Sequence, residues 1–262
     1  MRAARRAAAW ALLCLCLAAP RPAAAEPFCR LALAMAIDVS ASVDEAEQAL
    51  QTGGLAAALR DPDVLSTMLL PDGSAVALTA FTWSGRFDQQ VIAPWTLVRS
   101  AADAERVARR IEAVTPRRRQ LPTAIGSAMY FAARLHRAAP MRCGRQVIDV
   151  AGDGIWNAGV TPYRLREWGE LDGFEINGLV IRGESPDPFA YYQREVIQGP
   201  GAFVLSIDGY GAYQDGMKRK LLRELTPRLS RGPGDRRPAA GGAGAAPVRA
   251  AANAPPPHAR TR

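Results

Sequence analysis

Short apolar runs alternate with longer amphipathic stretches between residues 30 and 226. The run LALAMAI at residues 31–37 has the length of a strand, and its continuous apolarity is typical of a central parallel strand covered on both faces. Further strands are expected at residues 75–83, 87–95, 145–152, 174–183 and 202–207. Helices are expected at residues 44–59, 101–114, 124–138, 162–171, 188–197 and 213–225.

The order of these elements predicts the fold class. Strands that alternate with helices form mostly parallel sheets with helices on both faces. The third strand follows the second after only three residues, which is short enough for a hairpin, and Pro94 restricts its end to an edge. We therefore expect an α/β fold with a doubly wound, mostly parallel six-stranded sheet and one antiparallel edge strand. Gly53 and Gly54 weaken the first expected helix.

The two ends of the chain differ in composition from its centre. Residues 1–25 combine an arginine-containing start, a short apolar stretch and three alanines before Glu26, which is the pattern of a secretory signal peptide. A membrane anchor is the alternative, but the apolar run is shorter than the roughly 20 residues that cross a bilayer. Residues 231–262 are mostly Pro, Ala, Gly and Arg, and a disordered tail is expected there. A single domain at residues 26–230, periplasmic or secreted, is the resulting expectation.

The net charge of +8 comes from these two ends. Residues 1–25 carry four arginines and no acid, and residues 231–262 carry six arginines and one aspartate. The expected domain between them has 23 basic and 24 acidic residues and is close to neutral. The basic excess therefore does not predict binding to nucleic acid.

Oxygen-bearing side chains follow two of the expected strands. Asp38, Ser40 and Ser42 occupy alternate positions after the first strand, and Asp153 follows the fourth. Thr123 lies between them in sequence, at the start of a helix. Ligands of open doubly wound sheets bind beyond the carboxyl ends of strands, so these residues are candidates for one site.

Each candidate also has a purely structural explanation. Ser42 or Asp44 could cap the helix that follows, and Thr123 could cap the helix expected at residues 124–138. Asp153 with Gly154 could form a plain turn.

Together these motifs resemble the von Willebrand factor type A domain and its metal-ion-dependent adhesion site. Asp38, Ser40 and Ser42 match the D-x-S-x-S element, Thr123 matches the loop threonine, and Asp153 begins the D-G element. The resemblance covers about residues 30–226 in element order and implies a Rossmann-like fold. More narrowly, AIDVSASVDEAE and VIDVAGDGIWN resemble an uncharacterised bacterial family of exported proteins of this type.

The resemblance implies a bound Mg²⁺, with Mn²⁺ or Ca²⁺ as alternatives, held by Asp38, Ser40, Ser42, Thr123 and Asp153. Hydroxyl and carboxylate oxygens are the hard ligands that Mg²⁺ prefers. In the family an Asp or Glu of a protein partner completes the coordination. We therefore expect a metal-dependent protein-binding module that is not an enzyme, binds no nucleic acid and has no membrane span after signal cleavage. The arginines at residues 117–119 could attract the acidic partner.

Outside the expected signal peptide the chain has two cysteines, Cys29 and Cys143. In an oxidising compartment they most simply form a disulfide, and two separate buried thiols are the alternative. Cys29 precedes Asp38 by nine residues, and Cys143 precedes Asp153 by ten. The family's strand order makes the first and fourth strands parallel neighbours, which implies that the cysteines meet at the opposite end of the sheet. A Cys29–Cys143 bridge is predicted.

Two other functions remain open. A hydrolase would use Ser40 or Ser42 as nucleophile with a histidine base, but His136 is expected on a helix and His258 in the tail. The chain contains neither G-x-S-x-G nor a phosphate-binding loop motif. A degenerate scaffold that binds no metal is the third possibility. Asp149, inside a strand, is expected to be a buried carboxylate with structural partners.

Overall fold

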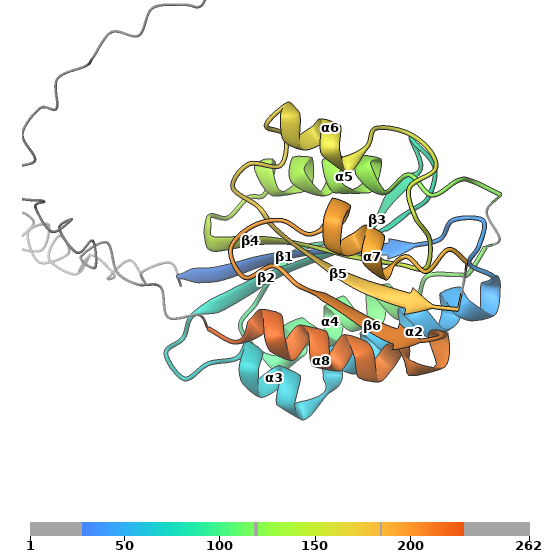
Figure 1. Ribbon diagram of the computed structural model, residues 1–262. Helices are drawn as coiled ribbons and strands as arrows, with labels where there is room; N and C mark the ends of the chain where they lie inside the picture. Colours follow the sequence, from blue (N-terminus) through green and yellow to red (C-terminus); the bar gives the residue numbers. More distant parts are fainter. Residues whose placement is uncertain (1–27, 118–119, 184, 228–262) are drawn as a thin grey trace, which may run out of the picture. The chain divides into compact units, whose positions relative to one another are not determined.

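The computed structural model describes residues 28–117, 120–183 and 185–227, and they contain a six-stranded sheet (Figure 1). The strands are β1 (Cys29–Asp38), β2 (Ala75–Trp83), β3 (Gln89–Val98), β4 (Cys143–Gly152), β5 (Glu175–Arg182) and β6 (Val204–Asp208). Their order is β3-β2-β1-β4-β5-β6. Only the β2–β3 pair is antiparallel, with β3 at an edge, so the predicted fold class is confirmed.

Helices cover both faces of the sheet. One face carries α2 (Glu45–Arg60), α3 (Pro62–Met68), α4 (Ala101–Glu112) and α8 (Tyr213–Leu225). The other carries α5 (Ile125–Arg137), α6 (Pro162–Glu167), α7 (Phe189–Tyr191) and the π-helical turn η1 (Tyr192–Val196). Figure 1 shows these two layers below and above the sheet.

Strand β1 is central because its side chains are apolar on both faces. Its larger residues, such as Leu33 and Met35, pack against the layer of α2 and α8. Ala34 and Ala36 face the opposite core, which contains the buried side of α5. Small side chains on this face leave room for α5, so one apolar run serves two cores.

Gly54 allows α2 and α8 to pack closely. A Cβ atom at Gly54 would lie 3.0 Å from Tyr213 Cδ1 and 3.1 Å from Gln214 N. The two glycines do not interrupt α2, which begins at a capping box formed by Asp44 and Glu47. Packing against α8 therefore compensates for the low helix propensity of glycine.

Three helical segments differ from the expectation. Helix α3 was not expected, although Asp61 caps it and Pro62 opens it, which are ordinary helix-start signals. Helix α6 ends at Glu167, two residues before Gly169, whose φ of 69° suits glycine. The expected helix at residues 188–197 is only the short α7 followed by η1.

The predicted disulfide is confirmed. Cys29 and Cys143 are direct partners in the β1–β4 register, with their Cα atoms 4.5 Å apart and their sulfurs bonded. They lie at the amino ends of the two strands, opposite the edge that carries Asp38.

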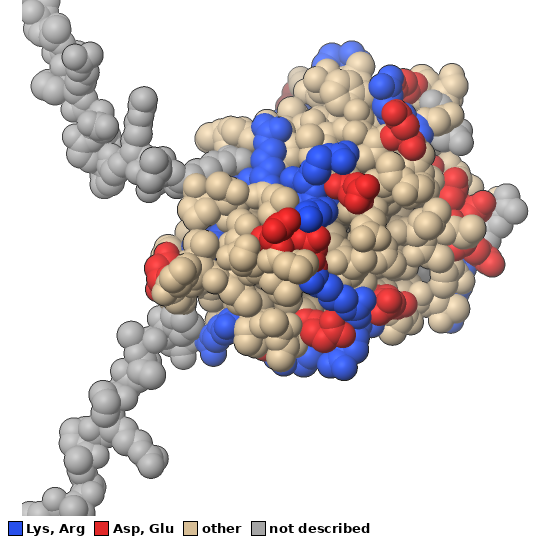
Figure 2. All heavy atoms as spheres, turned by 90° about the horizontal axis from the view of Figure 1, so that it is seen from below, with Lys and Arg blue, Asp and Glu red and all other residues tan. Residues whose placement is uncertain are grey.

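The surface of the α2–α8 layer mixes both signs of charge (Figure 2). Lys218 pairs with Asp61 and Asp63, and Arg60 pairs with Glu105. The described residues contain no helix that is long and apolar enough to span a bilayer. The expected signal peptide and the tail from residue 231 lie outside the described residues.

Candidate metal site

The carboxyl ends of β1 and β4 lie side by side at one edge of the sheet. Ile37 pairs with Ala151 in the register of these parallel neighbours. Asp38 therefore ends β1 beside Gly152, the last residue of β4, and Asp153 begins the following connection. The strand order alone brings the two carboxylates together.

A chain of hydroxyl contacts links three separate connections at this edge. Ser42 Oγ donates a 2.8 Å hydrogen bond to Asp153 Oδ1. Ser40 Oγ lies 3.3 Å from Ser42 Oγ, and the Thr123 hydroxyl makes a long contact of 3.4 Å with Ser40 Oγ. Asp38 Oδ1 accepts a 2.8 Å hydrogen bond from the Ser40 backbone N–H. All five residues of the predicted site thus form one cluster.

The carboxylates of this cluster are almost completely buried. Asp38 is 0% exposed and Asp153 is 2% exposed. Burial first, and then the charge of Asp153, raise the pKa of Asp38 well above its usual value. Asp38 Oδ2 has no hydrogen-bond partner among the described residues. A buried carboxylate oxygen of this kind needs a partner, which a proton, a water molecule or a cation can supply, so the cluster is compatible with a bound cation.

Gly152 keeps the space beside this oxygen open. A Cβ atom there would lie 2.8 Å from Asp38 Oδ2 and 2.6 Å from the Tyr192 hydroxyl oxygen. A larger residue would therefore displace one of the two groups.

The ligand set limits which cations suit the cluster. In the part of the chain that the structure describes, no three His, Cys, Asp or Glu side chains group together as metal ligands. The cluster instead combines two carboxylates with three hydroxyl groups. Oxygen-only sets of this kind suit hard cations such as Mg²⁺ and Ca²⁺.

The structural alternatives for these residues can be compared with the geometry. Asp44, and not Ser42, caps α2, because its side chain accepts the N–H of Glu47. Helix α5 begins at Ile125 and has no side-chain cap, so Thr123 is not the cap of that helix. Ser42 and Thr123 therefore have their hydroxyl groups within the cluster instead.

Two supporting contacts were not expected from the sequence. The Tyr210 hydroxyl donates a 2.9 Å hydrogen bond to Asp153 Oδ2. Tyr210 lies in the 3-10 turn η2 (Tyr210–Ala212) after β6, and only its place after a parallel strand could have indicated it. Asn157 holds the Thr123 loop from both sides, since its Oδ1 accepts the Thr123 N–H at 2.7 Å and its own N–H bonds the Thr123 carbonyl.

A known protein family matches the residues that form this fold. The family model described as "Protein of unknown function (DUF1194)" matches residues 28–229. The chain belongs to this family. No curated protein gives a significant match to the DUF1194 chain.

Solved structures similar to this DUF1194 domain share its fold at low sequence identity. Proximal thread matrix protein 1 from the mussel byssus has a TM-score of 0.54 and 16% identity, over 76% of this chain and 49% of that one. A von Willebrand factor type A protein from Catenulispora acidiphila has a TM-score of 0.50 and 19% identity, over 75% and 43%. The DUF1194 domain therefore has the von Willebrand factor type A fold, and the chain spans about half or less of these proteins.

Another structure of the mussel protein has zinc in its metal-ion-dependent adhesion site motif. It has a TM-score of 0.50 and 16% identity, over 76% of this chain and 48% of that one. At this identity the similarity concerns the fold alone.

His136 of the DUF1194 domain does not lie beside the serines of the cluster, so it is not placed to act as their catalytic base. Its Nε2 lies 3.0 Å from the Val147 carbonyl oxygen, and its ring packs between Trp95 and Phe174. Burial lowers the pKa of His136 to about 4. Within the described residues the serines of the cluster have no histidine base, and His258 lies outside those residues.

Asp149 is separate from the cluster, as expected. It is 1% exposed and pairs with Lys220 Nζ at 2.6 Å. Lys220 also lies 2.5 Å from Glu224 Oε1, and both of these side chains are fully buried. Asn177 Nδ2 donates a 2.9 Å hydrogen bond to the same Glu224 oxygen. The sequence indicated a structural role for Asp149 but not its partners on α8.

Part of the expected arginine patch is described. The backbone N–H and carbonyl of Arg117 are both held by the Gln48 side chain, at 3.0 Å and 2.9 Å. The other two arginines of the run, at residues 118 and 119, lie outside the described residues. The role of this run in attracting a partner stays a prediction.

Proposed function

We propose that this DUF1194 domain is an exported protein-binding module whose activity depends on a divalent cation. The observation that carries the proposal is the cluster of five oxygen-bearing side chains from three connections, closed by the hydrogen bond from Ser42 to Asp153. The Asp38 oxygen without a hydrogen-bond partner among the described residues is a further position that a cation would satisfy.

In this proposal Mg²⁺ is the ion, with Mn²⁺ or Ca²⁺ as alternatives. The hydroxyl groups of Ser40, Ser42 and Thr123 would supply neutral oxygens, and Asp38 and Asp153 would supply negative charge. The bound ion would act as a Lewis acid that accepts a further oxygen ligand. Because neutral hydroxyls make up much of the set, an Asp or Glu of a partner protein is the proposed additional ligand.

Export is proposed from two features. The pattern at residues 1–25 is that of a secretory signal peptide. The Cys29–Cys143 disulfide is of a kind that forms and persists in oxidising compartments. A periplasmic or secreted location agrees with both.

Thermal unfolding with increasing Mg²⁺, Mn²⁺ or Ca²⁺, after treatment with EDTA, tests the proposed cation. A cation at 100 times its Kd should stabilise the fold by about 2.7 kcal/mol, which raises Tm by about 5–11 °C for a domain of this size. Asp38→Ala and Ser42→Ala should lose most of this shift. Ser66→Ala is the matched control, because Ser66 is an exposed serine that bonds only within α3. No shift with any of the three ions would support a metal-free scaffold instead.

A further inference from the structure

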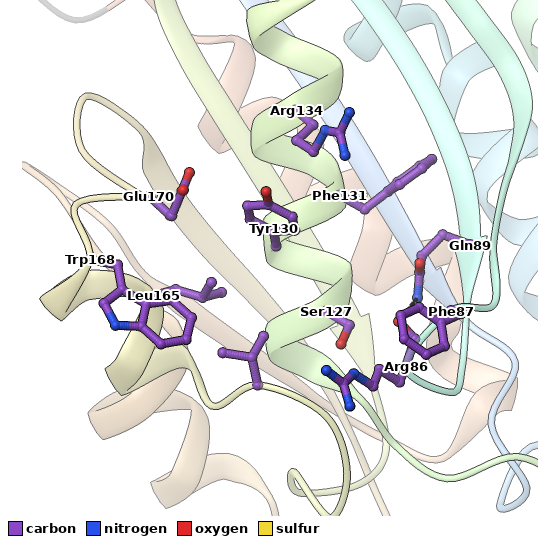
Figure 3. A pocket seen from close by; sticks show the side chains of 11 residues that line it. Arg86, Phe87, Gln89, Ser127, Tyr130, Phe131, Arg134, Leu165, Trp168 and Glu170 are labelled. Carbon is purple, nitrogen blue, oxygen red and sulfur yellow. Dashed lines mark hydrogen bonds between the residues drawn. The ribbon is translucent and has the colours of Figure 1, made fainter.

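A groove of about 490 Å³ runs along α5, outside the candidate metal site. One wall is the β2–β3 hairpin with Arg86 and Phe87, and the other is the α6 region with Trp168. Figure 3 shows these walls on either side of α5, with Tyr130 and Arg134 along the helix between them.

Both walls expose large aromatic side chains. Phe87 is 87% exposed and Trp168 is 64% exposed. Isolated exposed apolar residues are ordinary, but two large exposed rings that line one hollow are a feature of interaction sites. Trp, Tyr and Arg are also the residues that most often dominate binding energy in protein interfaces.

The groove has an uncompensated positive charge. Neither Arg86 nor Arg134 forms an ion pair with a carboxylate among the described residues, and Arg86 lies over the Phe87 ring at 5.0 Å. Glu170, the acidic residue of the lining, is already paired with Arg137 at 2.7 Å. An occupant that supplies carboxylates would therefore complement the groove.

The positions of the two arginines set the spacing of those carboxylates. A Cβ atom at Gly159 would lie 2.6 Å from Ser127 Oγ and 3.7 Å from Arg86 Cγ, so Arg86 is adjacent to Ser127. Arg134 is seven residues farther along α5, or about 10 Å at the helical rise. In an extended segment this distance corresponds to about two to four residues.

We propose that the groove binds a short extended segment of a partner protein that carries two acidic residues two to four positions apart and a bulky apolar side chain. The carboxylates contact Arg86 and Arg134, and the apolar side chain packs against Trp168. Residues 231–262 of this chain are a poorer occupant, because they carry six arginines and one aspartate. A nucleic acid is disfavoured by the near-neutral charge of residues 26–230. The proposal requires no cation, so it can fail or succeed independently of the proposed metal function.

Peptide selection on the full chain tests this proposal. A random twelve-residue phage library is selected in EDTA on the intact protein, and the enriched peptides are then measured by fluorescence anisotropy. Enrichment of peptides with two acidic residues at the stated spacing beside Trp, Phe or Leu is expected. Arg86→Gln/Arg134→Gln should weaken their binding at least 10-fold, as should Trp168→Ala, and replacement of the peptide's acidic residues by amides should do the same.

The matched control is Arg106→Gln/Arg109→Gln, which removes two exposed arginines from α4 on the other face of the sheet and should leave binding unchanged. Four outcomes would overturn the proposal. They are no enrichment, enrichment of basic or proline-rich peptides like residues 231–262, binding that the groove variants do not weaken, and tighter binding of a labelled oligothymidine than of any peptide. Circular dichroism confirms that each variant is folded.

Discussion

Replacing Lys220 by methionine would leave two buried carboxylates, Asp149 and Glu224, without their cation. Lys220 is 0% exposed and lies within 2.6 Å of Asp149 and 2.5 Å of Glu224. Methionine keeps most of the apolar stem, so the substitution chiefly removes the charge. Removing one partner of a buried ion pair typically costs about 3–5 kcal/mol, and we expect a loss of this size at pH 8.

The expected loss depends on pH in a defined direction. In the wild type, burial raises the pKa of Asp149 to about 7 although Lys220 opposes the rise. Without Lys220 the buried Asp149 carboxyl should hold its proton to higher pH. The variant's folded state then binds more protons than that of the wild type, so the loss should shrink as pH falls, by up to about 1.4 kcal/mol per pH unit.

Guanidinium unfolding followed by tryptophan fluorescence, in EDTA at pH 5 to 8, measures both effects. The triple variant Lys220→Met/Asp149→Asn/Glu224→Gln is the control, because it removes all three charges and should recover most of the lost stability. A loss below about 1 kcal/mol at pH 8, with no pH dependence, would refute the reasoning, since it would mean that these charges are solvated.

Three further predictions concern other contacts. Gly54→Ala should destabilise the fold by about 1–2 kcal/mol, because its Cβ atom would meet α8. Gly53→Ala should stabilise the fold by up to about 1 kcal/mol, because Gly53 has open space around it. Equal effects of the two substitutions on the free energy of unfolding would contradict the close approach of α2 and α8. Loss of the Cys29–Cys143 bridge, which spans 114 residues, should lower the free energy of unfolding by about 3–5 kcal/mol in chemical denaturation, and a change below about 1 kcal/mol would contradict this. Because burial lowers the pKa of His136 to about 4, the unfolded state binds more protons between pH 6.5 and 4, and stability should fall by about 3 kcal/mol across that window. His136→Gln should remove this fall in acid titrations of stability, and an unchanged pH profile would be evidence against a buried neutral ring.

Much of the fold could be predicted because its determinants are local. The apolar run at residues 31–37 is a strand with two buried faces, and the structure makes it the centre of the sheet. Pro94 lies on an edge strand, as its missing N–H requires. The expectation was wrong at residues 188–197 because the apolar period there is compatible with a helix but does not reveal the π-helical turn at Tyr192–Val196.

The residues of the candidate site could also be predicted from the sequence, because D-x-S-x-S and D-G are short motifs next to strand ends. Their convergence was not a local property. It required β1 and β4 to be neighbours, which joins Ser42 to Asp153 across 111 residues. Tyr210 contacts the same aspartate from the connection after β6, which lies two strands beyond β4 in the sheet. No sequence motif indicated this contact.

By itself, the sequence determined the alternation of strands and helices, the polar motifs at two strand ends and the near-neutral charge of the domain, because periodicity, capping and composition act over a few residues. Tertiary structure alone decided that Lys220 neutralises Asp149, and that two arginines without an ion-pair partner among the described residues line one groove with two exposed rings beside α5. Such contacts join elements far apart in the chain. Their energies depend on strand order and burial, which a short stretch of sequence does not contain.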